Sequence, residues 1–250
     1  MNEDSLKAKL KTISKETGKN FNELFKQLIF ERLLARLSIS PHKETLIFKG
    51  GFCLRQYIDI RRETKDIDFL IRLSNTNEQK IASIIKDVSS EKIDDGFQFL
   101  DASLVRLDVE HKKYPGFRIT IPVLFGKISD KIQIDIGVGD IVFEDSIEIA
   151  TLGYKEDPLF GKGSISILAY PAEFIFSEKL QAIIHLKALN SRMKDYFDCY
   201  TLIKENALDT EKTKIALKKT FNHRSTKIGL LVDYSEQLTI PWSAYTKKVE

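Results

Sequence analysis

Hydrophobic residues along the chain follow two periods, and each period predicts one type of secondary structure. In residues 20–37, apolar side chains recur at three- and four-residue intervals, which is typical of an amphipathic helix. Residues 78–90 carry isoleucine and valine at the same helical spacing. Three other segments, residues 66–72, 117–123 and 131–136, are rich in β-branched and aromatic residues and predict strands. We expect these strands to form one sheet.

Two adjacent glycines separate a predicted strand from a predicted helix. Residues 45–49 are short and apolar, as at the end of a strand or in a buried turn. Gly50 and Gly51 follow, and residues 52–58 are expected to restart as a helix. The glycines would therefore form a loop that leads into the N-terminus of a helix.

The pattern becomes helical towards the end of the chain. A strand-like segment at residues 164–168 is followed by Pro171, which suits the first turn of a helix. Three helices are predicted from there, at residues 171–189, 192–204 and 210–221. A boundary near residue 165 would thus separate a mixed region from a helical one.

The predicted fold class is α+β. Residues 1–165 would form a mixed sheet domain flanked by helices, including N-terminal helices, and residues 166–250 a helical C-terminal domain. The length of 250 residues fits one large domain or two modest ones. With 42% hydrophobic and 30% charged residues, the composition is that of an ordinary globular protein.

Net charge, cysteine content and the length of apolar runs indicate the class of protein and its location. The formal net charge of +3 is too small to argue for nucleic-acid binding by itself. Cys53 and Cys199 lie far apart and form no disulfide framework, which favours a reducing, cytoplasmic setting. No apolar run approaches the roughly 20 residues needed to span a bilayer, so we expect neither secretion nor membrane insertion.

The sharpest chemical feature is Asp66-Ile67-Asp68 at the start of a predicted strand. Side chains two apart on a strand share a face, so both carboxylates project together while Ile67 faces the core. Adjacent carboxylates repel each other, and a site that keeps both ionised usually supplies a cation. Oxygen ligands of this kind suit Mg²⁺ or Mn²⁺. The competing interpretation, two exposed polar residues on a solvated sheet face, is common for an isolated pair.

A third carboxylate and the glycine pair lie on neighbouring predicted elements. In residues 131–136, three isoleucines occupy one face and send Asp135 to the other. If this strand lies beside the one with Asp66 and Asp68, three carboxylates converge, as two-metal phosphoryl transfer requires. Upstream, the glycines of Lys49-Gly50-Gly51 allow backbone amides to approach a phosphate closely. Each feature alone also has a structural explanation, as a strand residue or a turn.

Charged residues in the predicted helices admit two interpretations. Lys179 lies among apolar neighbours, where a lysine can extend its ammonium to solvent without any function. Asp195 and Asp198 are one turn apart on one helix face, which is either part of a site or a solvated surface. Basic residues between positions 212 and 219, with His223 and Arg224, could contact an RNA backbone or form a solvated face.

These motifs, taken in order, resemble those of the AbiEii/AbiGii toxin family, a branch of the DNA polymerase β-like nucleotidyltransferases. KGGFCLRQY at residues 49–57 looks like the family's KGGTxL loop, and residues 62–69 are similar to its RxSxDIDF signature. Residues 171–180 resemble the PxEyxxxEKLxA helix, and residues 192–198 the RxKDyyD helix. The resemblance spans most of the chain and implies a nucleotidyltransferase-type sheet.

The resemblance implies a role for each matching residue. Phe52 stands where the family commonly has a small hydroxyl residue, which leaves only backbone contacts to phosphate there. Thr64 replaces the more frequent serine and should preserve a hydroxyl hydrogen bond. The nucleotide-binding set would be Lys49, Gly50, Gly51, Thr64 and Lys179, the metal ligands Asp66, Asp68 and Asp135, and the catalytic set these three with Lys179 and Asp195.

The implied reaction transfers a nucleoside monophosphate from a nucleoside triphosphate to an acceptor hydroxyl, with Mg²⁺ or Mn²⁺. The resemblance points to RNA as the acceptor, with tRNA a candidate, and to a toxin of a bacterial toxin–antitoxin or phage-resistance system with a cognate antitoxin. Transfer to a protein or a small molecule is an alternative, as is a module that binds a nucleotide without turnover. A nuclease is less favoured, because the glycine loop would have no role in it.

Overall fold

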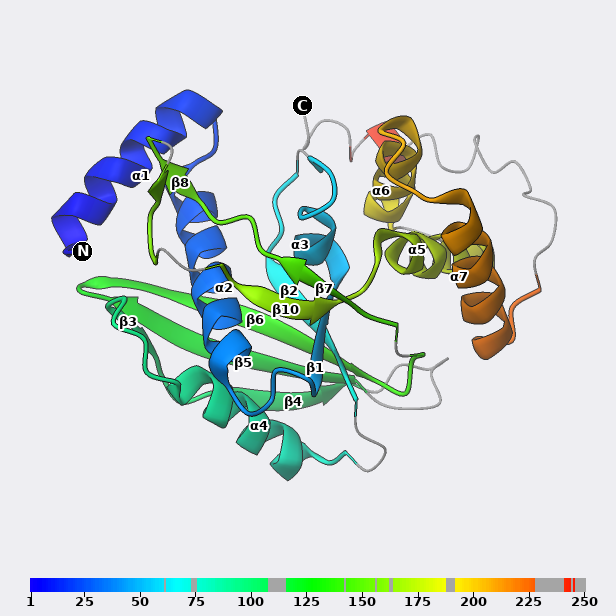
Figure 1. Cartoon of the computed structure of the whole chain (residues 1–250), viewed down its shortest axis with the longest axis horizontal. Coiled ribbons are helices and arrows are strands. Elements are labelled where there is room, and N and C mark those ends of the chain that lie inside the picture. Colours follow the sequence, from blue (N-terminus) through cyan, green and yellow to red (C-terminus); the bar gives the residue numbers. More distant parts are fainter. Residues whose placement is uncertain are drawn as a thin grey trace. The chain divides into compact units, whose positions relative to one another are not determined.

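The structure is a computed structural model that describes residues 1–60, 62–72, 76–107, 116–141, 143–155, 157–161, 164–187, 192–227, 241–243 and 245. Its contacts divide the chain into two compact units (Figure 1). Unit 1 consists of Met1–Phe52 and Glu63–Ala169, and unit 2 of Cys53–Arg62 and Tyr170–Glu250. Within the described residues, every helix is too short or too polar to cross a membrane.

Unit 1 contains a mixed sheet with helices, which confirms the predicted fold class. Its helices are α1 (Glu3–Thr17), α2 (Phe21–Ile39) and α4 (Glu78–Ser90), and α3 (Gly50–Leu54) begins in it. Its strands are β1 (Leu46–Lys49), β2 (Asp66–Ile71), β3 (Phe97–Phe99), β4 (Ser103–Leu107), β5 (Gly116–Phe125), β6 (Ile128–Val138), β7 (Asp145–Glu148), β8 (Gly153–Tyr154), β9 (Asp157–Pro158) and β10 (Ser166–Ala169).

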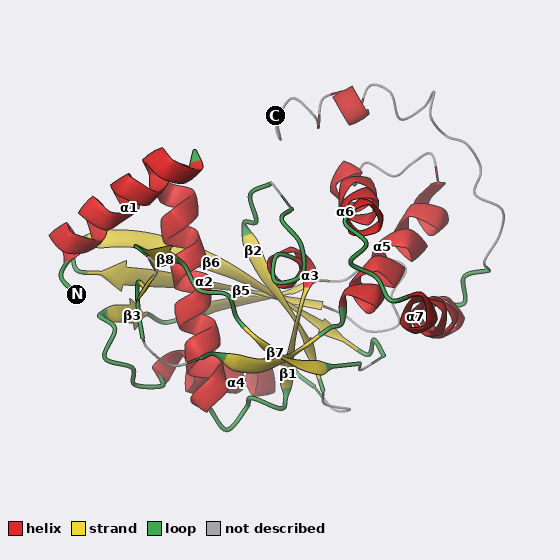
Figure 2. Ribbon diagram, turned by 45° about the horizontal axis from the view of Figure 1, so that its top comes forward, coloured by secondary structure: helices red, strands yellow, loops and turns green. Residues whose placement is uncertain are grey.

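The main sheet places the three strands expected from the sequence side by side. Its order is β3-β5-β6-β2-β1-β10-β7, with β4 also paired to β5, while β8 and β9 form a separate hairpin. Strand β2 runs parallel to β6 and β1 parallel to β10, and the other pairings are antiparallel. The three strands belong to one mixed sheet, as predicted, and the structure shows in addition that β2, β6 and β5 are consecutive in it (Figure 2).

Helix α2 crosses one face of this sheet and is more buried than an amphipathic pattern suggests (Figure 1). It begins where predicted, because the Asn20 side chain caps it by accepting a hydrogen bond from the amide of Glu23 at 2.9 Å. Every residue of 28–37 is buried, since α1, α4, β6 and β10 all pack against the helix. The helix thus fills the centre of unit 1.

The helix after the glycine pair differs from the prediction. It covers Gly50–Leu54, not residues 52–58, so the glycines form its first turn instead of a separate loop. Phe52 is 2% exposed and packs on Phe30 and Phe48, with ring centroids 5.0 and 5.9 Å away. This aromatic contact fixes the start of the helix against α2 and β1.

Unit 2 is helical, in agreement with the pattern of the C-terminal residues. Helices α5 (Ala172–Leu186), α6 (Met193–Lys204) and α7 (Thr210–His223) match the three predicted segments, and α5 contacts both of the others. Pro171 is the N-cap of α5, one residue before the predicted helical position. The predicted last residues of this helix, 188 and 189, lie outside the described residues.

A buried ion pair joins α2 to the segment before β3. The Arg36 guanidinium donates to both carboxylate oxygens of Asp95 at 2.8 and 2.9 Å, and both side chains are 3% exposed. Arg36 also donates to the carbonyl of Phe97 at 3.1 Å. Because the pair is desolvated, each charge depends on the other.

We predict that Asp95→Asn destabilises the protein by about 3–5 kcal/mol, because it leaves the buried Arg36 charge without its counter-charge. The exposed neighbour Asp94 provides the matched control, and Asp94→Asn should change the free energy of unfolding by less than about 0.5 kcal/mol. Urea unfolding followed by circular dichroism measures both. Equal effects of the two substitutions would contradict the assignment.

Candidate active site

Strand β2 directs two carboxylates to one face of the sheet. Ile67 and Phe69 are 0% and 2% exposed and point into the core beneath the helices. Asp66 and Asp68 alternate with them and are half-buried on the other face. The alternation expected from the sequence is confirmed for this strand.

Strand β6 brings a third carboxylate to the same face. It pairs with β2 in parallel, with Asp68 in register with Asp135 and Asp66 with Gln133. Ile134 and Ile136, on either side of Asp135 in sequence, are buried on the opposite face. Neighbouring strands lie about 4.8 Å apart, so the sheet brings Asp66, Asp68 and Asp135 together in unit 1.

An arginine that the sequence did not single out belongs to this group. Arg118 on β5 is in register with Asp135, and its Nε and one terminal nitrogen donate to the two carboxylate oxygens at 2.8 and 2.7 Å. These hydrogen bonds raise the pKa of Arg118 above its ordinary value, and the charges of Asp66 and Asp68 add to the effect. Its place on the polar face of a predicted strand was the available signal.

A lysine flanks the carboxylates on the other side. Lys49 at the end of β1 is in register with Asp68, so four neighbouring strands carry the row Lys49, Asp68, Asp135 and Arg118. The Lys49 ammonium lies 3.6 Å from the carboxylate of Asp140. One basic residue therefore borders the adjacent carboxylates on each side, which reduces their mutual repulsion.

Gly50 lies directly against Asp68, and only glycine fits there. A β-carbon at Gly50 would overlap the carboxylate of Asp68. The backbone φ of Gly50 is also +75°, a region that side-chain-bearing residues rarely adopt. The glycine thus lets the backbone approach Asp68 closely, while the expected approach to a phosphate stays a prediction.

Thr64, two residues before Asp66, is 6% exposed. Its hydroxyl has no hydrogen-bond partner in the described part of the chain. A buried hydroxyl without a partner is unfavourable by itself, so this group is able to donate to a ligand. The hydroxyl hydrogen bond expected from the sequence therefore stays a prediction, because its partner is not among the described residues.

The oxygen-only donors of this face fit a hard divalent cation. Asp66, Asp68 and Asp135 offer carboxylates alone, the ligand type that Mg²⁺ and Mn²⁺ prefer. Among the described residues, no three acidic, histidine or cysteine side chains already converge on one point. Both oxygens of Asp135 are held by Arg118 in this arrangement.

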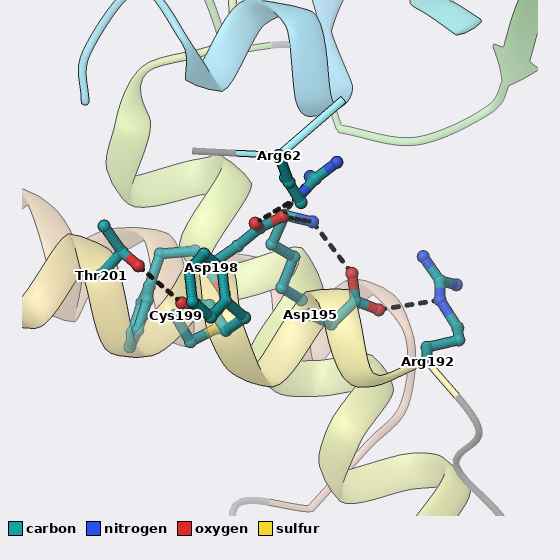
Figure 3. Close-up of polar contacts among 9 residues, drawn as sticks. Arg62, Arg192, Asp195, Asp198, Cys199 and Thr201 are labelled. Carbon is teal, nitrogen blue, oxygen red and sulfur yellow. Dashed lines mark hydrogen bonds and ion pairs between the residues drawn. The ribbon is translucent and has the colours of Figure 1, made fainter. Parts of the chain in front are cut away.

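Lys179 and Asp195 lie in unit 2, where they form an ionic cluster with Asp198 and Arg62. Figure 3 shows Arg62, Asp195 and Asp198 of this cluster. The Lys179 ammonium is 2.9 Å from Asp195 and 2.8 Å from Asp198, and both carboxylates are 0% exposed. Arg62 donates to both oxygens of Asp198 at 2.9 and 2.7 Å. Arg192 lies 2.8 Å from Asp195. A solvated face is therefore the wrong interpretation for these two aspartates.

The cluster keeps its charges despite burial. Burial alone would lower the pKa of Lys179, but the charges of Asp198 and Asp195 outweigh it and raise this pKa. Burial would likewise raise the pKa of Asp198, but Arg62 and Lys179 lower it below its ordinary value. Each buried charge is thus compensated inside unit 2.

The chain belongs to the family described as "Nucleotidyl transferase AbiEii toxin, Type IV TA system", which it matches over residues 32–248. It is accordingly a nucleotidyltransferase of a toxin–antitoxin family, and the resemblance inferred from its motifs is confirmed. Among curated proteins, none matches the chain.

Solved structures with an overall likeness are nucleotidyltransferase-like proteins. A candidate nucleotidyltransferase from Helicobacter pylori has 16% identity and a TM-score of 0.48, covering 92% of this chain and 97% of its own. JHP933 from Helicobacter pylori has 16% identity and a TM-score of 0.46, with coverages of 91% and 93%. An antigenic nucleotidyltransferase-like protein from Paracoccidioides brasiliensis has 12% identity and a TM-score of 0.38, with coverages of 86% and 93%.

Replacement of Gly50 by alanine should both strain the backbone and displace Asp68. Gly18 is the matched control, because its φ is +73° but no atom lies within 4 Å of the added carbon. We expect Gly18→Ala to lower the free energy of unfolding by about 1–2 kcal/mol, and Gly50→Ala by about 1–3 kcal/mol more because of the overlap. Urea unfolding of both variants tests this, and equal losses would refute the steric role.

The ionic cluster predicts a pH-dependent contribution to stability. The lowered pKa of Asp198 means that its contribution is present above its ordinary value of 3.8 and is lost as the pH falls through the lowered pKa. The raised pKa of Lys179 means that its contribution is present below 10.5 and is lost as the pH rises through the raised pKa.

We therefore expect Asp198→Asn to cost about 3–5 kcal/mol near neutral pH, with a loss that shrinks below 3.8. Free energies of unfolding of wild type and variant, measured from about pH 2 to 7, give this difference. Glu205→Gln, at an exposed position just after α6, is the control and should have no effect beyond about 0.5 kcal/mol. A pH-independent loss would contradict a charge-based role.

Proposed function

We propose that this protein transfers a nucleoside monophosphate from a nucleoside triphosphate to a hydroxyl group of RNA, with a divalent cation. The observation that carries the proposal is the register of β2 and β6, which brings Asp68 beside Asp135 with Asp66 on the same face. Family membership supports the reaction class, and the site supports the metal dependence.

Asp66, Asp68 and Asp135 would hold Mg²⁺ or Mn²⁺. A cation bound there supplies positive charge at the reacting phosphate and at the departing pyrophosphate. The half-buried position of Asp66 and Asp68 leaves their carboxylates accessible from the open face of the sheet. Lys49 and Arg118, at the two ends of the row, reduce the repulsion between the carboxylates of Asp68 and Asp135.

The triphosphate would lie at the Gly50 end of the row. Gly50 lets the backbone come close to Asp68, so the amides of Gly50 and Gly51 are able to donate to phosphate oxygens near the metal ligands. Lys49, directly before them and in register with Asp68, would add positive charge. Thr64 would donate its unpartnered hydroxyl.

The reaction exchanges one phosphorus–oxygen bond for another. The acceptor hydroxyl gives up its proton to solvent water near Asp135, and its oxygen forms a bond to the α-phosphorus. The bond from the α-phosphorus to the bridging oxygen breaks, and pyrophosphate leaves with that oxygen. The residues of this face act by positioning and charge neutralisation, which supply most of the acceleration in phosphoryl transfer.

RNA, with tRNA as a candidate, is the proposed acceptor, and transfer would block bacterial growth or phage propagation. Lys212, Lys214 and Lys218 are exposed on α7 and are able to contact a phosphate backbone. Arg224 donates to Gln181 at 3.0 Å and lies 3.2 Å from Glu178, so it is engaged within unit 2. A cognate antitoxin and a cytoplasmic location, where nucleotides and RNA meet, go with this role.

Two residues keep roles that are predicted but untested. Lys179 is expected to contact a phosphate and Asp195 to lie at the rim of the active site. In unit 2 the two side chains pair with each other at 2.9 Å. Substitution of either residue would therefore change stability as well as any contact to substrate, and a stability measurement must accompany an activity measurement.

The test is transfer of label from each α-labelled nucleoside triphosphate to total bacterial RNA with Mg²⁺. We expect labelled RNA with wild type, and a loss of at least about 100-fold with Asp68→Asn or a chelator, because the metal ligand is removed. The surface variant Asp94→Asn should retain full activity.

Two other outcomes have clear meanings. Label on protein or on a small molecule instead of RNA would replace the proposed acceptor while keeping the reaction class. Triphosphate binding without pyrophosphate release would indicate a nucleotide-binding module and would overturn the proposal of turnover.

A further inference from the structure

Arg118 holds Asp135, one of the three carboxylates of the proposed metal site. Its guanidinium holds both oxygens of Asp135, at 2.8 and 2.7 Å, in a bidentate pair. Neither the sequence motifs nor the family match assigns this arginine a role. Its side chain comes from β5, on the opposite side of β6 from the strand with Asp66 and Asp68.

The pair is tight but open to solvent. The Arg118 side chain is 41% exposed and that of Asp135 is 23% exposed, unlike the fully buried carboxylates of unit 2. An ion pair at this exposure is held weakly enough for another cation to compete for it. In the amide orientation that its neighbours favour, Gln133 accepts from Arg118 at 3.0 Å, so the guanidinium also has a neutral acceptor within reach.

We propose that Arg118 is an internal counter-ion that competes with the divalent cation for Asp135. Two adjacent carboxylates, Asp68 and Asp135, repel each other unless a positive charge lies between or beside them. Arg118 supplies that charge while no cation is bound. Its guanidinium must release at least one carboxylate oxygen of Asp135 before that oxygen is able to bind the metal. Arg118 is a positioning residue that weakens metal binding, and this inference rests on the proposed function.

The proposal makes a prediction that a purely structural role does not make. Removal of a residue that merely supports the site weakens metal binding, whereas removal of a competing cation strengthens it. Arg118→Gln should therefore tighten binding of Mn²⁺ about tenfold, because the metal no longer displaces a guanidinium. Arg118→Lys keeps the charge and should bind Mn²⁺ with nearly the wild-type affinity.

The matched control is Arg106→Gln. Phe117 precedes Arg118 in β5, and its side chain is buried on the face of the sheet opposite to the carboxylates. Arg106 on β4 is in register with Phe117 and shares its face, so Arg106 carries the same charge as Arg118 but lies away from the carboxylates. Its removal changes the net charge of the protein by the same amount. We expect Mn²⁺ binding of this variant to stay within about twofold of wild type.

Titration of the full chain with Mn²⁺, followed by calorimetry or by electron paramagnetic resonance of free Mn²⁺, measures these affinities without nucleotide. Thermal unfolding of each variant establishes that it is folded, and Arg118→Lys provides a second test if Arg118→Gln is unstable. Equal or weaker Mn²⁺ binding by a folded Arg118→Gln overturns the proposal. If Arg118→Gln does not fold, a lysine variant that binds more than about threefold tighter or weaker than wild type overturns it instead.

Asp68→Asn separates failure of this inference from failure of the proposed function. If Mn²⁺ binds wild type and Asp68→Asn abolishes that binding, the metal site exists and only the variants of Arg118 decide the counter-ion role. If wild type binds no Mn²⁺, or Asp68→Asn leaves the binding intact, the proposed metal site is wrong and the counter-ion role fails with it.

Discussion

The parallel pairing of β2 with β6 is the constraint on which the rest of the site depends. Its register runs from Asp66 opposite Gln133 to Ile71 opposite Val138. A slip of β2 by one residue would turn Ile67, which is 0% exposed, towards solvent, and it would move Asp66 and Asp68 to the buried face, away from Asp135. Burial of the isoleucines therefore fixes the positions of Asp68 and Asp135 together, and the core of unit 1 determines the geometry of its open face.

The two units compensate acidic side chains in different ways. In unit 2, Asp198 is fully buried and satisfied by Arg62 and Lys179, so its charge is committed to the structure. In unit 1, the side chain of Asp135 is 23% exposed and that of its partner Arg118 is 41% exposed, so water reaches this pair. The difference follows from desolvation, because breaking a buried pair leaves a charge that water does not reach. The buried cluster thus holds α5 and α6 together, whereas the pair on the sheet face stays in contact with solvent.

The departures from the family pattern have local explanations in the packing of unit 1. Phe52 replaces a small hydroxyl residue and packs between α2 and β1, so its side chain contributes to the core instead of the nucleotide site. At Gly50 it is the backbone that lies close to Asp68. Thr64 keeps the hydroxyl at a buried position.

The sequence by itself determined the hydrophobic period of the helices and strands. In the strands, this alternation also determined that Asp66, Asp68 and Asp135 lie on the face away from the core. The sequence also determined the helices of residues 78–90 and 210–221 closely, because helix periodicity and caps depend on near neighbours. Only the tertiary structure decided that β6 lies beside β2, that Arg118 holds Asp135, and that Asp195 and Asp198 are buried. These are pairings between residues far apart in the chain, and they follow from how the faces pack together, which no local pattern encodes.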